Sequence, residues 1–178
     1  DLINYLIHHD SMKALLFFIL CASNYGKANL FPNISGKNLN GDKFTVPKSF
    51  EKPINVLVVA FKHSQQEMVD TWLKPLAQME VENKEMKYYE FPVMARMGSW
   101  KRWMIYNGMK MGIRDTKQRS RTVSFHIDKE PFKEKLNIID EDSIHLFIVR
   151  QDGLIKGAIE GVYSSDKLQS LRKILSNR

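Results

Sequence analysis

Polar residues gather where a strongly hydrophobic run, residues 54–61, gives way to a helical pattern: His63, Ser64, Gln65 and Gln66. The first backbone N–H groups of a helix have no partner within it, so this position can hold an anion or a backbone carbonyl. The alternative is simple capping, with Ser64 and Glu67 as a capping box, and we favour it. A Ser/His nucleophile is not indicated, because no third group orients the histidine and no Gly-x-Ser-x-Gly elbow occurs.

Sulfur and indole side chains are concentrated in residues 94–111, which hold five of the nine methionines and two of the three tryptophans. Thioethers can bind Cu(I), and methionine-rich surfaces adapt to varied apolar partners. A third interpretation, which we favour, is that these residues form helix core with one adaptable packing face. If they form a partner surface instead, Trp100 and Trp103 are its anchors, and Trp72 of the preceding helix is a further candidate.

A basic segment follows, with Arg114, Arg119 and Arg121 close to Lys110 and Lys117. A solvated connection is the ordinary interpretation of such a segment, and a docking site for an acidic protein or phosphate is the alternative. Together with Lys62, His63 and Gln66, residues 114–121 could also line a small-molecule pocket. His126 and His145 fall on predicted strands, so we expect core or edge positions for them and predict no metal and no cofactor.

The single cysteine, Cys21, excludes an intrachain disulfide and a CxxC couple. The formal charge of +7 and the pI of 9.4 favour acidic partners or anionic surfaces. No nucleic-acid partner is expected, since no basic run exceeds two residues and no nucleic-acid-binding motif is present.

Residues 1–28 are predicted to be a leader, and residues 29–178 one domain. Within the leader, residues 12–28 have a basic start, an apolar run over 14–22, and small residues at Gly26 and Ala28. This pattern is typical of a secretory signal peptide. The apolar run is about half of the ~20 residues that span a bilayer, so no permanent membrane span is expected. A buried N-terminal helix is the alternative.

The remaining patterns predict an α/β domain. Asn40-Gly41 indicates a hairpin within residues 31–50, and the β-branched run 54–61 indicates a strand buried on both faces. Further predicted strands are 86–91, ended by Pro92, then 122–127, 144–149 and 154–159, the last two joined by Asp152-Gly153. Predicted helices are 64–80 with an internal Pro75, 98–111, one or two turns at 131–136, and a closing helix to about residue 175.

This order of elements resembles the thioredoxin superfamily over residues 30–176. The sequence is also similar to bacterial thioredoxin-like proteins, through Gln65-Gln66-x-x-Val69-Asp70-x-Trp72-Leu73 and Gly108-Met109-x-x-Gly112-Ile113-x-Asp115. A more distant similarity is to mitochondrial ATP-synthase assembly factors of the same superfamily. The resemblance implies a thioredoxin-like mixed sheet with flanking helices and an N-terminal extension.

Two departures from that superfamily bear on activity. Its nucleophilic cysteine sits at the start of the first long helix, where this chain has residues 62–67 without sulfur, and its cis-proline before the hairpin has no counterpart here. The chain is therefore not expected to be a dithiol oxidoreductase or a thiol peroxidase. We expect a redox-inactive, exported module, periplasmic or secreted if bacterial, that binds a protein in assembly or folding. The alternative is an enzyme of non-thiol chemistry with a small-molecule pocket at the cysteine-free site.

Overall fold

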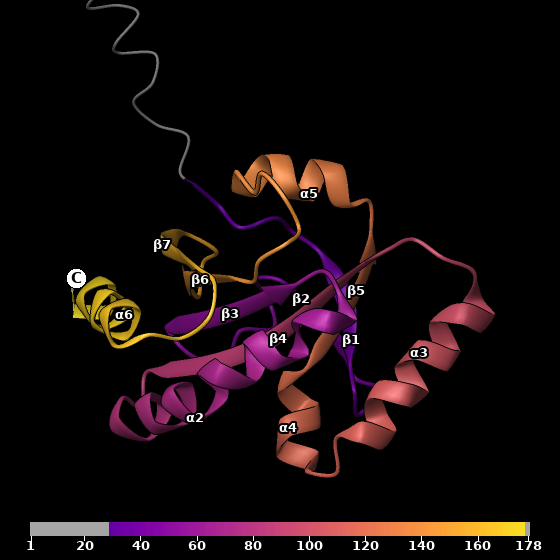
Figure 1. Cartoon of the computed structure of the whole chain (residues 1–178), viewed down its shortest axis with the longest axis horizontal. Helices are drawn as coiled ribbons and strands as arrows, with labels where there is room; N and C mark the ends of the chain where they lie inside the picture. The colour runs from indigo at the N-terminus through magenta and orange to yellow at the C-terminus, as the bar shows by residue number, and fades with distance from the viewer. Residues whose placement is uncertain (1–28, 177–178) are drawn as a thin grey trace, which may run out of the picture.

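The computed structural model describes residues 29–176, so the predicted leader lies outside the described residues. Those residues form a mixed seven-stranded sheet in the order β2-β1-β5-β4-β3-β6-β7, with helices packed around it (Figure 1). The strands are β1 (Ser35–Asn38), β2 (Lys43–Thr45), β3 (Ile54–Ala60), β4 (Met86–Ala95), β5 (Val123–Ile127), β6 (His145–Arg150) and β7 (Ile155–Glu160). The helices are α2 (Gln66–Glu82), α3 (Ser99–Gly112), α4 (Thr116–Arg121), α5 (Lys129–Leu136) and α6 (Ser165–Ser176).

The centre of the sheet is β3, which pairs in parallel with β4 and antiparallel with β6. Successive side chains of a strand point to opposite faces, and here both faces are covered. Val56 and Val58 pack with α2 and α6, whereas Leu57 and Val59 pack into an aromatic-rich core with α5 and the N-terminal segment. The predicted strand buried on both faces is confirmed.

Two tight turns occur where the sequence predicts them. Gly41 has a φ of +100° and joins β1 to β2, which pair antiparallel. Gly153 has a φ of +93° in the β6–β7 connection, where the Leu154 N–H donates to Asp152 Oδ1 at 3.1 Å. A positive φ is costly for residues with a Cβ, so both positions require glycine or a residue that tolerates the left-handed region.

One predicted boundary and one predicted connection were wrong. β4 continues through Pro92 to Ala95. Pro92 lies opposite Ala60, the last pair of the β3–β4 ladder, so its missing N–H costs no bond within that ladder. The polar stretch before β5 contains the helix α4, whose first turn is capped by Asp115 accepting from the Lys117 N–H at 2.8 Å.

Candidate functional site

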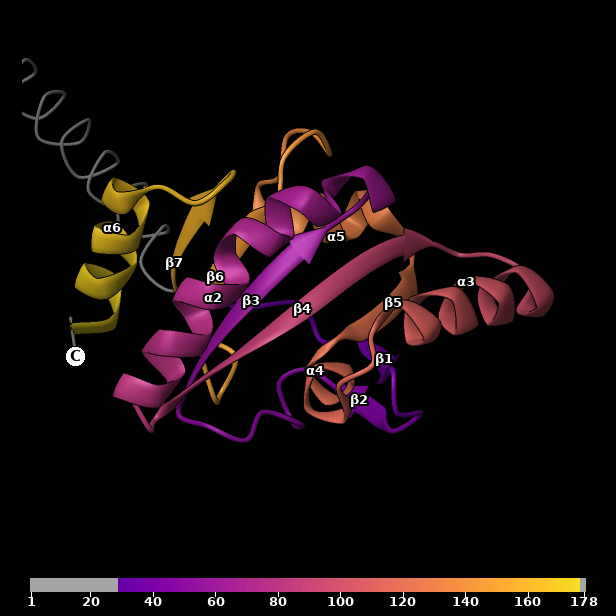
Figure 2. The same ribbon diagram turned by 60° about the horizontal axis from the view of Figure 1, so that its bottom comes forward.

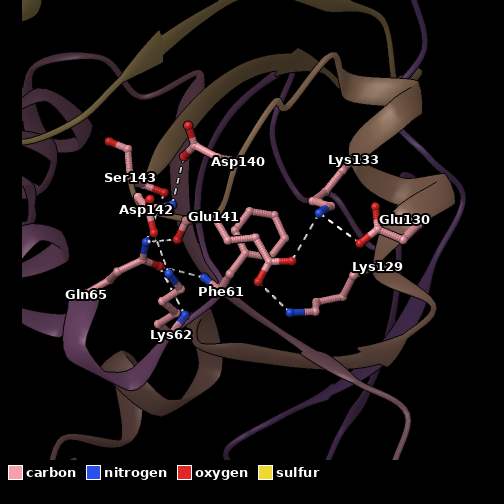
Figure 3. A network of polar contacts seen from close by, with 10 residues as sticks. All are labelled: Phe61, Lys62, Gln65, Lys129, Glu130, Lys133, Asp140, Glu141, Asp142 and Ser143. Atoms are coloured by element: carbon pink, nitrogen blue, oxygen red, sulfur yellow. Dashed lines mark hydrogen bonds and ion pairs between the residues drawn. The ribbon is translucent and has the colours of Figure 1, made fainter.

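The region that corresponds to the reactive site of the thioredoxin superfamily lies between the end of β3 and the loop that leads into β6. After β3 the chain forms a short 3₁₀ turn (His63–Gln65) and then enters α2. Residues 140–143 approach this turn from the other side (Figure 3). The resemblance to thioredoxins places the reactive thiol at this helix start, so its contents decide which chemistry is available.

A buried glutamine lies in this stretch. Gln65 is 2% exposed. Its Oε1 accepts hydrogen bonds from the backbone N–H groups of Phe61 at 2.7 Å and Lys62 at 3.1 Å. Its Nε2 donates to the carbonyls of Glu141 at 2.7 Å and Ser143 at 3.0 Å. Both donors and both acceptor positions of the amide are thus engaged within the protein, and Gln65 clamps the two loops together.

Ion pairs between lysines and the acidic run 140–142 surround this glutamine clamp. Glu141 Oε2 accepts from Lys129 Nζ at 2.5 Å, and Glu141 Oε1 lies 3.3 Å from Lys133 Nζ. Burial acts to raise the pKa of Glu141, but the hydrogen bond and charge of Lys129, joined by Lys133, lower it overall. At the exposed rim, Lys62 Nζ lies 2.5 Å from Asp142 Oδ1. The carboxylates of Glu141 and Asp142 are therefore engaged by lysines.

The capping box predicted for Ser64 and Glu67 was wrong. The residue before α2 is Gln65, and no side chain caps the helix there. The reciprocal contact instead uses the Gln65 side chain and the Lys62 backbone, two residues before the predicted pair, because a 3₁₀ turn precedes α2. The pattern was found in the right segment but assigned to the wrong pair.

The other candidates at this end of the sheet fall into two groups. His63 and Gln66 are exposed beside the clamp, and Gln66 Nε2 donates to Asp70 Oδ1 at 2.8 Å. Trp72 is fully buried between α2 and the sheet, where its Nε1 donates to the Gly161 carbonyl at 2.9 Å. The indole of Trp72 therefore packs in the core and presents no surface to a partner.

Helix α3 differs from the interpretation favoured from sequence, which placed its Trp and Met side chains in the core. None of its residues is buried. Trp100 is 72% exposed and Trp103 56%, and the two rings stack with centroids 5.1 Å apart. Met104 and Met111 are also exposed. Figure 2 shows α3 running outward from the β4–β5 side of the molecule. The predicted helix is present, but nothing in the described residues covers its Trp and Met side chains.

The basic segment is divided by the fold. Arg114 is exposed, and Arg119 Nε donates to the Ile113 carbonyl at 2.6 Å. Arg121 is 3% exposed, pairs with Glu80 Oε2 at 2.8 Å, and stacks over the Tyr88 ring at 4.0 Å. Arg121 is thus a buried structural cation rather than part of a solvated loop.

Sequence reasoning missed a buried carboxyl in the middle of β4. Glu90 is 5% exposed and accepts hydrogen bonds from Gln118 Nε2 and, at 3.5 Å, from Thr122 Oγ1. Burial is the main cause that raises the pKa of Glu90 to about 7, and Arg121 opposes the shift. The available signal was a lone carboxylate in the strand, placed between the aromatic residues Tyr89 and Phe91.

Two clefts border these elements. One, of about 450 Å³, lies between α2 and α4 and is lined by Glu80, Lys84, Tyr88, Lys117 and Arg121 among others. The second, of about 490 Å³, lies beside β7 and includes Ile139 and His145. Neither of these two clefts is lined by Lys62, His63 or Gln66, so neither brings the polar run and the basic segment together.

Residues 29–176 also bear on metal binding and on membrane insertion. No group of three or more His, Cys, Asp or Glu side chains there is placed to hold a metal ion. No helix among these residues is both long and apolar enough to cross a membrane.

The fold and the cysteine-free site define a thioredoxin-like protein. The chain belongs to the family described as ATP10 protein, whose sequence model matches residues 22–177. This is the assembly-factor group to which the sequence showed the more distant resemblance. No curated protein matches the chain.

Solved structures confirm the thioredoxin-like fold. The chain is similar to the thioredoxin domain of a thiol-disulfide oxidoreductase from Bacteroides vulgatus, at 15% identity and a TM-score of 0.52, covering 86% of this chain and 100% of that one. It is also similar to BsSco, a member of the Sco family of cytochrome c oxidase assembly proteins, at 10% identity and a TM-score of 0.55, covering 84% and 95%. Yeast Sco1 matches at 12% identity and a TM-score of 0.54, covering 86% and 98%.

Proposed function

We propose that this chain is a redox-inactive assembly module that binds a protein client non-covalently during ATP-synthase assembly. Membership of the ATP10 protein family supports an assembly role. The observation that carries the redox-inactive part is the glutamine clamp. Gln65 bridges the two loops at the start of the helix, and residues 29–176 contain no cysteine.

The clamp accounts for how the scaffold works without its usual chemistry. A catalytic thioredoxin site needs an accessible nucleophile at the helix start. Here the Gln65 side chain bridges the two loops that would frame a substrate disulfide. Its Oε1 lies 2.7 Å from the Phe61 N, and its Nε2 lies 2.7 Å from the Glu141 carbonyl oxygen. This end of the sheet can present exposed groups such as His63 and Gln66, and residues 29–176 offer no thiol to exchange with a disulfide.

The experiment is complementation of cells that lack this protein, with assembled ATP synthase measured on native gels. The wild type and Cys21→Ser are expected to restore assembly equally. Loss of assembly with Cys21→Ser at normal protein level would contradict the redox-inactive proposal. Failure of the wild type to restore assembled ATP synthase would contradict the assembly role.

The enzyme hypothesis receives less support. It requires residues 62–66 and the basic segment to line one pocket, and the cleft between α2 and α4 contains Lys117 and Arg121 without the polar run. Arg121 is also committed to Glu80 and Tyr88.

Export remains part of the proposal. The leader pattern in residues 12–28 predicts cleavage after Ala28, which would leave a mature chain without any cysteine. N-terminal sequencing of the protein from its native compartment is expected to begin at Asn29. A mature chain that retains the apolar run 14–22 would contradict the export proposal.

A further inference from the structure

The exposed face of α3 has an unusual composition, and no element within residues 29–176 covers it. Trp100, Trp103, Met104 and Met111 recur at spacings of three, four and seven residues along the helix, which places them on one side of it. They account for four of the eight large hydrophobic side chains exposed within residues 29–176. Ile105, Tyr106 and Met109 lie on the other side and are half-buried, so the stripe points away from the fold.

The charge around this stripe has one sign. Residues 95–114 contain no Asp or Glu and five basic residues: Arg96, Lys101, Arg102, Lys110 and Arg114. None of the five forms an ion pair with another residue in 29–176. Two stacked indoles beside unpaired cations form a surface in which an apolar stripe is flanked by positive charge.

We propose that α3 docks on an anionic lipid surface, lying in the plane of the headgroups. An interfacial helix combines an aromatic and aliphatic face with Lys and Arg at its margins, and tryptophan prefers the headgroup level. The positive margins match the negative potential of anionic lipids, and the net charge of +7 acts in the same direction. An acidic protein partner could pair with the basic residues. It would also need an apolar groove to cover the indole and methionine side chains of the stripe. The proposal does not rest on the assembly role.

The test uses the intrinsic tryptophans of the full chain with vesicles of phosphatidylcholine, alone or mixed with phosphatidylglycerol. The three tryptophans are Trp72, Trp100 and Trp103, so residues 1–28 contribute no signal even if they bind lipid. With the anionic vesicles the emission is expected to shift to shorter wavelength and to be quenched by brominated acyl chains. Trp100→Phe/Trp103→Phe retains only the buried Trp72, whose emission is expected to stay unchanged.

Charge variants separate lipid recognition from unspecific adhesion. Lys101 and Lys110 lie at the two margins of the stripe, and Lys101→Gln/Lys110→Gln is expected to weaken binding to the anionic vesicles by roughly 25-fold, since each basic side chain near such a surface contributes about fivefold. The matched control Lys48→Gln/Lys74→Gln removes two exposed charges elsewhere, and its affinity for the anionic vesicles should fall much less. Inorganic phosphate should not release the protein at equal ionic strength, which distinguishes a lipid surface from a free anion.

Two results would overturn the proposal. One is an unchanged Trp100 and Trp103 emission with anionic vesicles at low salt, which would leave the face to a protein partner. The other is equal binding by the charge variant and its control. Loss of ATP-synthase assembly in the complementation experiment with vesicle binding intact would count against the assembly role alone.

Discussion

Replacing Glu90 with glutamine is expected to stabilise the folded chain above neutral pH and to change it little in mild acid. The carboxyl is buried in β4, and its hydrogen bonds come from Gln118 and Thr122, neither of which carries a charge. Glutamine has nearly the same shape, and its amide oxygen can accept from the same donors. The substitution therefore removes mainly the cost of a buried negative charge.

The magnitude follows from the raised pKa of Glu90, from 4.5 to about 7. Between these values the folded chain keeps a proton that the unfolded chain releases, so the free energy of unfolding falls as pH rises through this window. The difference corresponds to about 3 kcal/mol once Glu90 is ionised in both states. A glutamine side chain has no proton to lose in this range, so the variant Glu90→Gln should lack this decline.

Urea unfolding followed by circular dichroism measures the difference. At about pH 8 the variant Glu90→Gln is expected to be more stable by up to about 3 kcal/mol, and at about pH 5 nearly equal to the wild type. If the variant is destabilised by the same amount at both pH values, Glu90 is ionised throughout and its charge is compensated by Arg121. That result would refute the reasoning from burial.

Three further outcomes are expected from urea unfolding. Gln65→Ala should lower the free energy of unfolding by about 2–4 kcal/mol, because the Phe61 and Lys62 N–H groups lose their buried acceptor. The matched control is Gln66→Ala, at the exposed neighbouring position, and an equal effect of both substitutions would contradict the clamp. Glu80→Gln should lower the free energy of unfolding by about 3 kcal/mol, because the buried Arg121 loses its carboxylate partner. No change would show that the contact with the Tyr88 ring is enough to stabilise the Arg121 charge. Trp100→Ser/Trp103→Ser should stay within about 1 kcal/mol of the wild type, whereas a loss typical of core tryptophans would show that α3 is packed after all.

Local patterns predicted most of the elements, because those patterns act over short distances. The apolar run of β3, the Asp152-Gly153 turn and the spacing of α2 each depend on neighbouring residues. Each of these elements has the predicted type in the structure. Pro92 was misjudged because its effect depends on register: opposite Ala60, at the end of a ladder, the missing N–H costs little.

The site could not be predicted in the same way, because its contacts join distant residues. Gln65 meets the carbonyls of Glu141 and Ser143, which lie 76 and 78 residues away in the sequence. Arg121 meets Glu80 across 41 residues and so changes from an apparent surface charge to a buried one. For Glu90, the composition of the strand showed an isolated carboxylate, but only the surrounding fold fixes its burial and hence its pKa.

Helix α3 shows that the spacing of apolar residues does not identify what covers them. Its spacing predicts an apolar stripe equally well whether the stripe faces a core, a protein or a lipid surface. What distinguishes these is the absence of a covering element within residues 29–176, together with the absence of acidic residues over 95–114. A stripe that packed against the fold would not need five basic residues and no acidic one around it. The charge pattern is therefore the part of the sequence that identifies the environment of α3, and it favours an anionic surface.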